Sequence, residues 1–266
     1  MKIITCYKQI IFLSSILVIS CTSQKKLAYL NNLPETGGEE TFTMDVPEYK
    51  LQPRDILYIT IKAMTPDGRI TDFLTSTGSN MSNNSISQGD AGAFLYGYDI
   101  NPEGDIIIPV IGPINVEGLT LGETKRLLQA SANKVFNNST VECKLLSFKY
   151  TVIGEVRAPG TYINYNNYLT VFEAIGRAGG MGDYGNRSRV LVIRPVDKGT
   201  KTFNLNLQDK KILSSEAYFL QPNDVVIVEP LSQKIFNMNL PTFSFILSSV
   251  TSTITMTLLL INYFGK

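Results

Sequence analysis

The sequence predicts an α+β protein made of small mixed sheets and few helices, followed by an amphipathic transmembrane helix at the C-terminus. Short β-branched runs recur between turns that contain Gly or Pro, which is typical of short strands. Two segments begin with the Thr-x-x-Glu pattern of a helix capping box. No charged residue occurs from Ile235 to Gly265, which favours a membrane segment at the end of the chain.

The composition excludes several kinds of site. The 266 residues include 24 Lys and Arg against 23 Asp and Glu, so no general attraction to nucleic acid is expected. The chain has no His, which excludes Ser-His-Asp and Cys-His catalysis and His-ligated metals. Its three cysteines (Cys6, Cys21 and Cys143) cannot form a four-cysteine zinc site. We therefore expect no metal and no cofactor.

Residues 1–20 are predicted to be a lipoprotein signal peptide. Lys2 and Lys8 precede an apolar run over 10–19, which is short for a membrane span and suited to a signal core. The run ends in Val-Ile-Ser-Cys and resembles the bacterial lipobox, so Cys21 is the candidate lipidation residue. Several acyl chains on one residue give a stable anchor. The alternatives are an ordinary secretory signal, or an N-terminal helix in which the cysteine is incidental.

The position after Cys21 favours the outer membrane, because Thr22 stands where inner-membrane lipoproteins carry Asp. The expected location is thus a lipid anchor in the outer membrane with the body in the periplasm. Residues 21–43 are polar, contain Pro34, and predict a tether.

The body of the chain contains the predicted strands and helices. Two turns of the form Leu-Gln-Pro-x-Asp, over 51–55 and 220–224, each lead into a β-branched strand. Thr120 and Thr170 are the caps of two predicted helices, and Gly179-Gly180 ends the second. Further strands are predicted over 105–110, 141–146, 150–156, 189–194 and 225–229.

Two shorter features carry separate predictions. Residues 75–92 contain 13 Ser, Thr, Asn or Gly among 18 and predict a mobile loop, with contact to a substrate or partner as the alternative. Cys143 lies in an alternating strand pattern and is expected to be a small core residue rather than a reactive thiol.

Two long motifs resemble the bacterial polysaccharide export proteins. The run from Ile106 to Thr120, with Gly104 before it, resembles the core of the export domain. The run from Tyr150 to Tyr162 resembles the start of an SLBB domain, a β-grasp-like module. Later landmarks of that module match Ala174-Ile175, Ala178-Gly179-Gly180, Arg189-Val190 and the 220–224 turn. The resemblance implies an export domain over 44–148, an SLBB domain over 149–232 and a linker over 233–242.

The resemblance to this Wza-like family also implies a function. Its members are outer-membrane lipoproteins that export capsular or extracellular polysaccharide through a homo-oligomeric ring, commonly an octamer, without catalysis. The implied partner is an inner-membrane polysaccharide co-polymerase or tyrosine kinase. One departure is Arg54 in the first turn, where the family carries Gly. Arg adopts a positive φ less easily than the Asn223 of the second turn, so a different turn geometry is expected there.

The C-terminal segment 243–266 is the predicted membrane helix, with Pro241 as the stop of whatever precedes it. Residues 243–264 would extend about 33 Å as a helix, enough to span a hydrocarbon core of about 30 Å.

At 100° per residue the hydroxyl and amide side chains of this segment cluster on one side of the helix. The pore-lining candidates are Ser244, Ser248, Thr251, Thr255 and Asn262. The lipid-facing candidates are Phe243, Ile246, Val250, Ile254 and Ile261. In the ring reading the C-terminus lies at the cell surface. A lone or interfacial helix and a buried helix of a soluble domain remain as alternatives.

Two other functions compete with a pore. A lipid-anchored sugar-binding or scaffold protein could use Tyr162, Tyr165 and Tyr168, although core or turn packing is the simpler role for these rings. A hydrolase would need paired carboxylates such as Asp99, Glu103 and Asp105. These carboxylates lie in a turn-and-strand region that matches the structural core of the family, which argues against catalysis.

Overall fold

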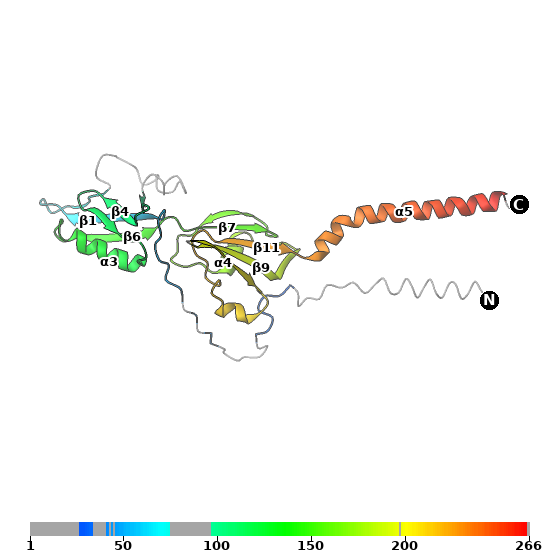
Figure 1. The fold of residues 1–266 in the computed structure, drawn as a ribbon, viewed down its shortest axis with the longest axis horizontal. Coiled ribbons are helices and arrows are strands. Elements are labelled where there is room, and N and C mark those ends of the chain that lie inside the picture. Colours follow the sequence, from blue (N-terminus) through cyan, green and yellow to red (C-terminus); the bar gives the residue numbers. More distant parts are fainter. Residues whose placement is uncertain are drawn as a thin grey trace.

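The computed structural model describes residues 27–33, 41, 42, 44, 46–74, 97–196 and 198–264. Figure 1 shows two domains in a row, with a long helix, α5, extending from the second. The predicted signal peptide, the lipidation residue Cys21 and the 75–92 loop lie outside the described residues.

The first domain is built on a four-stranded antiparallel sheet with β1 at its centre. β1 pairs with β2, β3 and β6, and its register with β6 places Ile59 opposite Cys143. A two-stranded hairpin of β4 and β5 and the helix α3 complete the domain. The bounds are β1 (Ile56–Met64), β2 (Ile70–Asp72), β3 (Tyr98–Asp99), β4 (Asp105–Ile108), β5 (Gly112–Asn115), α3 (Leu121–Ala132) and β6 (Thr140–Leu145).

The second domain contains a five-stranded mixed sheet in the order β10-β9-β11-β7-β8. β11 runs parallel to β7 and antiparallel to β9. The helix α4 and a short 3-10 helix, η2, lie between strands. The bounds are β7 (Lys149–Gly154), β8 (Gly160–Ile163), α4 (Val171–Arg177), β9 (Gly185–Val196), β10 (Gly199–Leu205), η2 (Lys210–Ser214) and β11 (Val225–Pro230). The predicted α+β class with small mixed sheets is therefore confirmed.

Each domain has its own hydrophobic core. The core of the first contains Leu57, Ile61, Ile106 and Leu128 from its sheet, hairpin and helix. The core of the second gathers side chains from β7, β9 and β11 beneath α4. Alternate residues of each strand point inward, as the period of a half-buried strand requires. Two separate cores make two folding units joined between β6 and β7.

Both predicted helix starts are confirmed by reciprocal capping bonds. In α3 the hydroxyl of Thr120 accepts from the Glu123 N–H at 3.2 Å, and the Glu123 carboxylate accepts from the Thr120 N–H at 2.8 Å. Thr170 and Glu173 repeat this arrangement in α4 with the same distances. Two N–H groups that have no partner inside the helix are thereby satisfied at each start.

The two Pro-containing turns share one geometry, so the expectation that Arg54 would alter the first turn was wrong. Arg54 has φ 78° and Asn223 has φ 66°, both in the left-handed region. The following aspartate closes each turn by accepting from the Gln N–H three residues before it: Asp55 from Gln52 at 3.0 Å and Asp224 from Gln221 at 2.8 Å. These charge-assisted bonds offset the roughly 1–2 kcal/mol that a side chain costs in this conformation.

Part of the predicted tether is docked on the second domain. The N–H groups of Leu30 and Asn31 donate to the carbonyls of Leu207 and Gln208 at 3.0 and 2.9 Å. The ring of Tyr29 packs against Phe172, with centroids 5.8 Å apart. Residues 27–33 therefore belong to the surface of this domain, because backbone bonds and ring packing hold them there.

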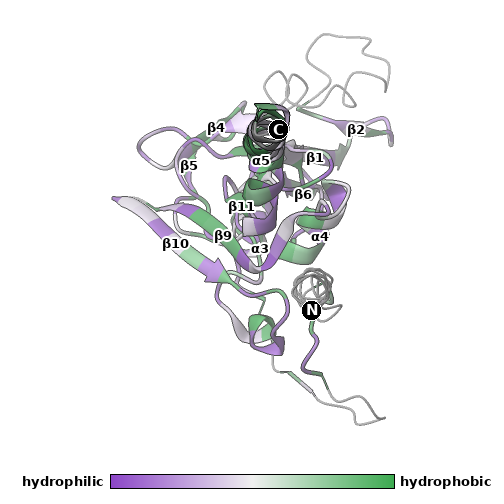
Figure 2. Ribbon diagram, turned by 90° about the vertical axis from the view of Figure 1, so that its right-hand side faces the viewer, coloured by the Kyte–Doolittle hydropathy of each residue, from purple (hydrophilic) through white to green (hydrophobic). Residues whose placement is uncertain are grey.

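The helix α5 (Ser232–Phe264) has 33 residues and begins earlier than expected. The predicted linker over 233–242 is helical, and Pro241 lies inside the helix rather than stopping it. Proline removes one backbone donor, so the carbonyl four residues earlier loses its usual partner, but a helix can continue past it at a cost. Figure 2 views the molecule from this end, so that α5 is seen nearly end-on.

The expected membrane span over 243–264 is not supported by the described residues. Within the ranges that the structure describes, no helix is both long and apolar enough to cross a membrane.

Candidate functional site

Several hydroxyl groups of α5 donate to backbone carbonyls of the same helix. Ser244, Ser248 and Thr251 donate to carbonyls three residues earlier at 2.9 Å, and Thr255 donates to the Thr251 carbonyl at 2.8 Å. Ser and Thr can in this way enter a weakly polar setting without an unpaired donor. Each oxygen keeps acceptor capacity for water or another hydroxyl.

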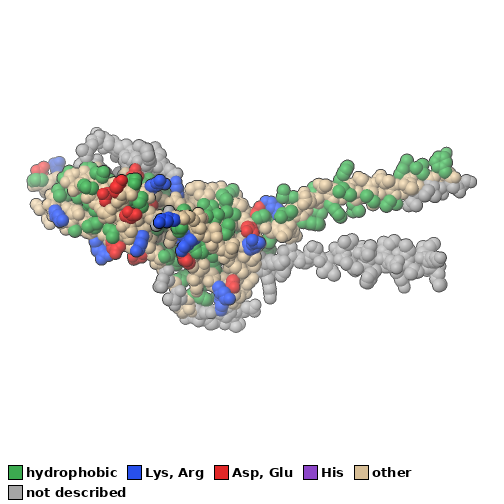
Figure 3. Space-filling model, viewed as in Figure 1, with side chains coloured by type: hydrophobic (Ala, Val, Ile, Leu, Met, Phe, Trp, Pro, Cys, Tyr) green, Lys and Arg blue, Asp and Glu red, His purple; other side chains and the backbone are tan. Residues whose placement is uncertain are grey.

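Three of the pore-lining candidates share one side of α5. Ser248, Thr251 and Thr255 line a shallow groove along the helix together with Ser252, Met256 and Leu259. Among the lipid-facing candidates, Phe243, Ile246, Val250 and Ile254 are all at least half exposed. The side chains of Ile261 and Asn262 lie outside the described residues. Figure 3 shows hydrophobic and other uncharged side chains along α5, with charged groups gathered near its start.

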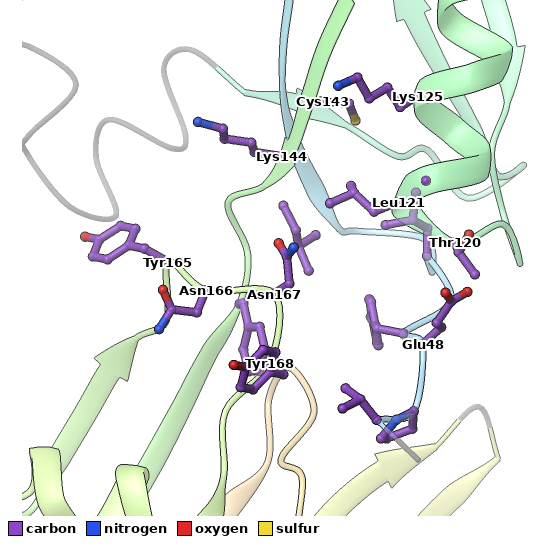
Figure 4. A pocket seen from close by; sticks show the side chains of 17 residues that line it. Glu48, Thr120, Leu121, Lys125, Cys143, Lys144, Tyr165, Asn166, Asn167 and Tyr168 are labelled. Carbon is purple, nitrogen blue, oxygen red and sulfur yellow. The ribbon is translucent and has the colours of Figure 1, made fainter. Parts of the chain in front are cut away.

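A cleft of about 630 Å³ lies between the two domains. Three parts of the first domain line it: the approach to β1, the start of α3 and the end of β6. The loop over Tyr165–Tyr168 lines it from the second domain. In Figure 4 this loop lies on one side of the cleft, with Glu48, Thr120 and Leu121 on the other.

The predicted tyrosine cluster is divided by the fold. Tyr162 stacks on the buried Tyr150, with ring centroids 5.7 Å apart, and its hydroxyl donates to the Ala158 carbonyl. Tyr165 and Tyr168 instead line the cleft and are 77% and 51% exposed. Packing therefore explains the first ring, and the other two remain available to a ligand.

A buried asparagine holds the loop that carries these two tyrosines. Asn164 is 1% exposed, and its amide donates to the carbonyls of Asn166 at 2.7 Å and Tyr168 at 3.3 Å. Its side-chain oxygen accepts from the Asn166 N–H at 3.3 Å. The backbone of the loop is thus fixed from below while the side chains of residues 165–168 face outward.

Cys143 is among the residues that line the cleft, and its expected role as a core residue is confirmed. It is 7% exposed and unpaired. Burial raises the pKa of its thiol to about 12, although nearby Lys125 acts in the opposite direction. The thiolate is the reactive form, so this cysteine is unreactive at neutral pH.

Labelling with iodoacetamide at pH 8 tests this directly. A thiol pKa near 12 instead of 9 makes the thiolate about a thousandfold scarcer. We expect Cys143 to label at least a hundredfold more slowly in the folded protein than in 8 M urea, as measured by mass spectrometry of its tryptic peptide. Equal rates in the two conditions would contradict a buried, protonated thiol.

The carboxylates considered for catalysis have structural contacts or lie apart from the cleft. Asp105 accepts from the Asn115 amide at 2.8 Å, and its N–H donates to the Asn101 side chain at 2.7 Å. Asp99 and Glu103 are exposed on β3 and in the turn before β4. Within the described residues, no three acidic or cysteine side chains are grouped as metal ligands.

Two buried aspartates form polar centres that sequence reasoning missed. Asp224, fully buried, receives the Nε and Nη2 groups of Arg194 at 3.0 and 2.8 Å, and Arg194 also donates to the Phe219 carbonyl at 2.9 Å. Asp55, 4% exposed, accepts from the hydroxyls of Tyr49 and Ser147 at 2.8 and 2.9 Å. The sequence signal that could have identified them is the aspartate at the end of each Leu-Gln-Pro-x-Asp turn.

Comparison with known proteins gives two matches to family models. The model described as polysaccharide biosynthesis/export protein matches residues 44–146, and the SLBB domain model matches residues 148–228. The boundary between them falls where β6 is followed by β7.

Curated relatives include two proteins named EPS I polysaccharide export outer membrane protein EpsA. The one from Ralstonia solanacearum is 30% identical over 140 residues, which is 50% of this chain and 36% of the relative. The one from Ralstonia nicotianae is 27% identical over 185 residues, which is 68% of this chain and 47% of the relative. The aligned region thus spans less than half the length of either relative.

Proposed function

Because the chain belongs to the bacterial polysaccharide biosynthesis/export family, in the Wza-like form with an SLBB domain after the export domain, we propose that it exports capsular or extracellular polysaccharide across the outer membrane. It acts as a non-catalytic conduit component. The observation that carries this proposal is the succession of the two matched domains followed by a long helix without charges beyond its first turn. The outer-membrane export named for both relatives supports it.

The conduit is a homo-oligomeric ring in which the α5 helices of several copies lie side by side. Ser244, Ser248, Thr251, Thr255 and Asn262 face the lumen, while Phe243, Ile246, Val250, Ile254 and Ile261 face lipid. A wet lumen accommodates hydroxyl side chains better than lipid does. Because the described lumen candidates already donate to their own helix, they offer a passing sugar acceptor atoms but few free donors. Weak contacts of this kind let the polymer move.

The second domain is held close to the membrane by a short leash. Lipid on Cys21 anchors the chain, and Tyr29 is the first described residue of the docked segment that contacts this domain, through Phe172 and Arg187. The eight residues from Cys21 to Tyr29 reach at most about 28 Å. The domain that carries α5 is thus kept within about 28 Å of the lipid, which favours insertion of the helix. The body lies in the periplasm, and its inner-membrane partner is a polysaccharide co-polymerase or tyrosine kinase.

A lipid-anchored sugar-binding or scaffold protein without a pore is the second candidate. The exposed tyrosines of the interdomain cleft favour it, because they could bind a sugar in the periplasm without any helix crossing the membrane. The two candidates differ in where the C-terminus lies.

An epitope fused after Lys266 separates them. In intact cells, antibody labelling of this epitope is expected at the cell surface, to at least half the level reached after permeabilisation. An epitope on a periplasmic protein serves as the negative control. Labelling confined to permeabilised cells would overturn the proposed pore and leave the lipid-anchored sugar-binding or scaffold protein as the supported function.

A further inference from the structure

The interdomain cleft presents side chains that suit a sugar. Tyr165 and Tyr168 offer exposed aromatic faces, and Asn166 and Asn167 between them are exposed amides. A pyranose ring has an apolar face of C–H groups and an edge of hydroxyls, so one ring needs both kinds of partner. Tyrosine supplies a large rigid surface at low entropic cost, and asparagine supplies adaptable donors and acceptors.

The loop is preorganised for binding. Asn164 ties its backbone at three points, and Tyr168 packs edge-on against Phe219 with centroids 6.1 Å apart. Tyr165 is 77% exposed, so the face of its ring is open to a ligand. A loop that is already ordered loses little entropy when a ligand arrives.

The cleft also has the size and charge of a ligand site. Its volume of about 630 Å³ falls within the roughly 300–1,000 Å³ of small-molecule sites. Lys144 and Lys125 line it against the single carboxylate of Glu48. Figure 4 shows Lys144 on the same side as Tyr165, where an ammonium group can meet a hydroxyl or an acidic group of a sugar.

We propose that this cleft is a saccharide-binding site in which Tyr165 and Tyr168 stack on sugar rings while Asn166 and Asn167 bond to ring hydroxyls. The site takes a short segment of the polymer, outside the α5 conduit. In choosing that polymer as the ligand, the inference rests on the proposed export function. The cleft would be a place on the periplasmic body where the polysaccharide is held.

The test is titration of the full-length protein in detergent with oligosaccharides of four to six sugars. These are cut by mild acid from the surface polysaccharide of the cells that make the protein. Calorimetry is expected to give a dissociation constant below about 1 mM. Tyr165→Ala with Tyr168→Ala should weaken binding at least tenfold, and Tyr165→Phe with Tyr168→Phe should stay within threefold of the wild type because the rings remain.

A matched control removes an equally exposed ring elsewhere. Tyr263, on α5, is 78% exposed against 77% for Tyr165, so Tyr263→Ala should leave the affinity unchanged. Thermal melts show whether the double Ala variant still folds, and single Tyr165→Ala, which truncates a mostly exposed ring, should still weaken binding at least threefold. Unchanged affinity in both Ala variants, or an equal loss in Tyr263→Ala, would overturn the site.

The same experiment separates this inference from export. If the oligosaccharides fail to bind while deletion of the terminal helix abolishes surface polymer, the cleft proposal fails and the export proposal stands. If the oligosaccharides bind through the tyrosines while deletion of the helix leaves export intact, the cleft proposal stands and the α5 conduit proposal fails.

Discussion

Replacing Asp224 by Ala is expected to lower the free energy of unfolding of the second domain by about 3–5 kcal/mol. Asp224 is fully buried and Arg194 is 3% exposed, so neither charge has water as an alternative partner. The substitution removes a paired carboxylate and leaves the guanidinium uncompensated in the interior. It also removes the acceptor that closes the turn at Gln221.

Urea unfolding followed by circular dichroism measures this loss. The matched control is Glu216→Ala, which breaks the exposed ion pair with Lys201 at 3.3 Å and should cost less than about 1 kcal/mol. Replacing both partners, with Arg194→Met and Asp224→Leu, should recover part of the loss because no buried charge is left alone. A cost for Asp224→Ala no larger than that for Glu216→Ala would contradict a buried ion pair.

Deleting residues 243–266 is expected to reduce surface polysaccharide to the level of a strain without the protein. The folded domains should persist, because among the described residues the ion pair and the side-chain hydrogen bond that join α5 to the second domain come from its first two turns. Lys234 forms an ion pair with Glu155, and Asn237 donates to the Tyr184 hydroxyl at 3.1 Å. Polysaccharide is measured on intact cells, and fractionation checks that the truncated protein stays in the outer membrane.

Point substitutions refine this experiment by testing the two sides of α5. An aspartate in place of Ser248 would face water in the lumen, whereas one in place of Val250 would face lipid at a cost of a few kcal/mol. Export is therefore expected to survive Ser248→Asp and to fall at least tenfold with Val250→Asp. Normal export by the deletion variant would refute the conduit, and equal damage from both substitutions would refute the assigned faces.

Local sequence patterns were enough to predict several features. The capping boxes at Thr120 and Thr170 depend on residues three positions apart, so their geometry follows from the sequence alone. The burial of Cys143 follows from alternation along one strand. The α+β class and the family resemblance likewise rest on short motifs read in order.

Two expectations that depended on one residue in isolation were wrong. Arg54 by itself argues against a left-handed turn, but Asp55 closes the turn from the next position and offsets the strain. Pro241 by itself argues for a helix stop, yet the helix α5 continues on both sides of it. In both places the chain adopts a conformation that the single residue disfavours.

The sequence by itself determined the local elements of this protein, their order and the family to which it belongs. The tertiary structure alone decided which distant residues meet: Arg194 with Asp224, Tyr29 with Phe172, and the 165–168 loop with the first domain across the cleft. The physical reason is the distance along the chain over which each kind of interaction acts. Capping and strand alternation act within a few residues, whereas buried pairs and clefts arise when packing brings together side chains that are far apart in the chain.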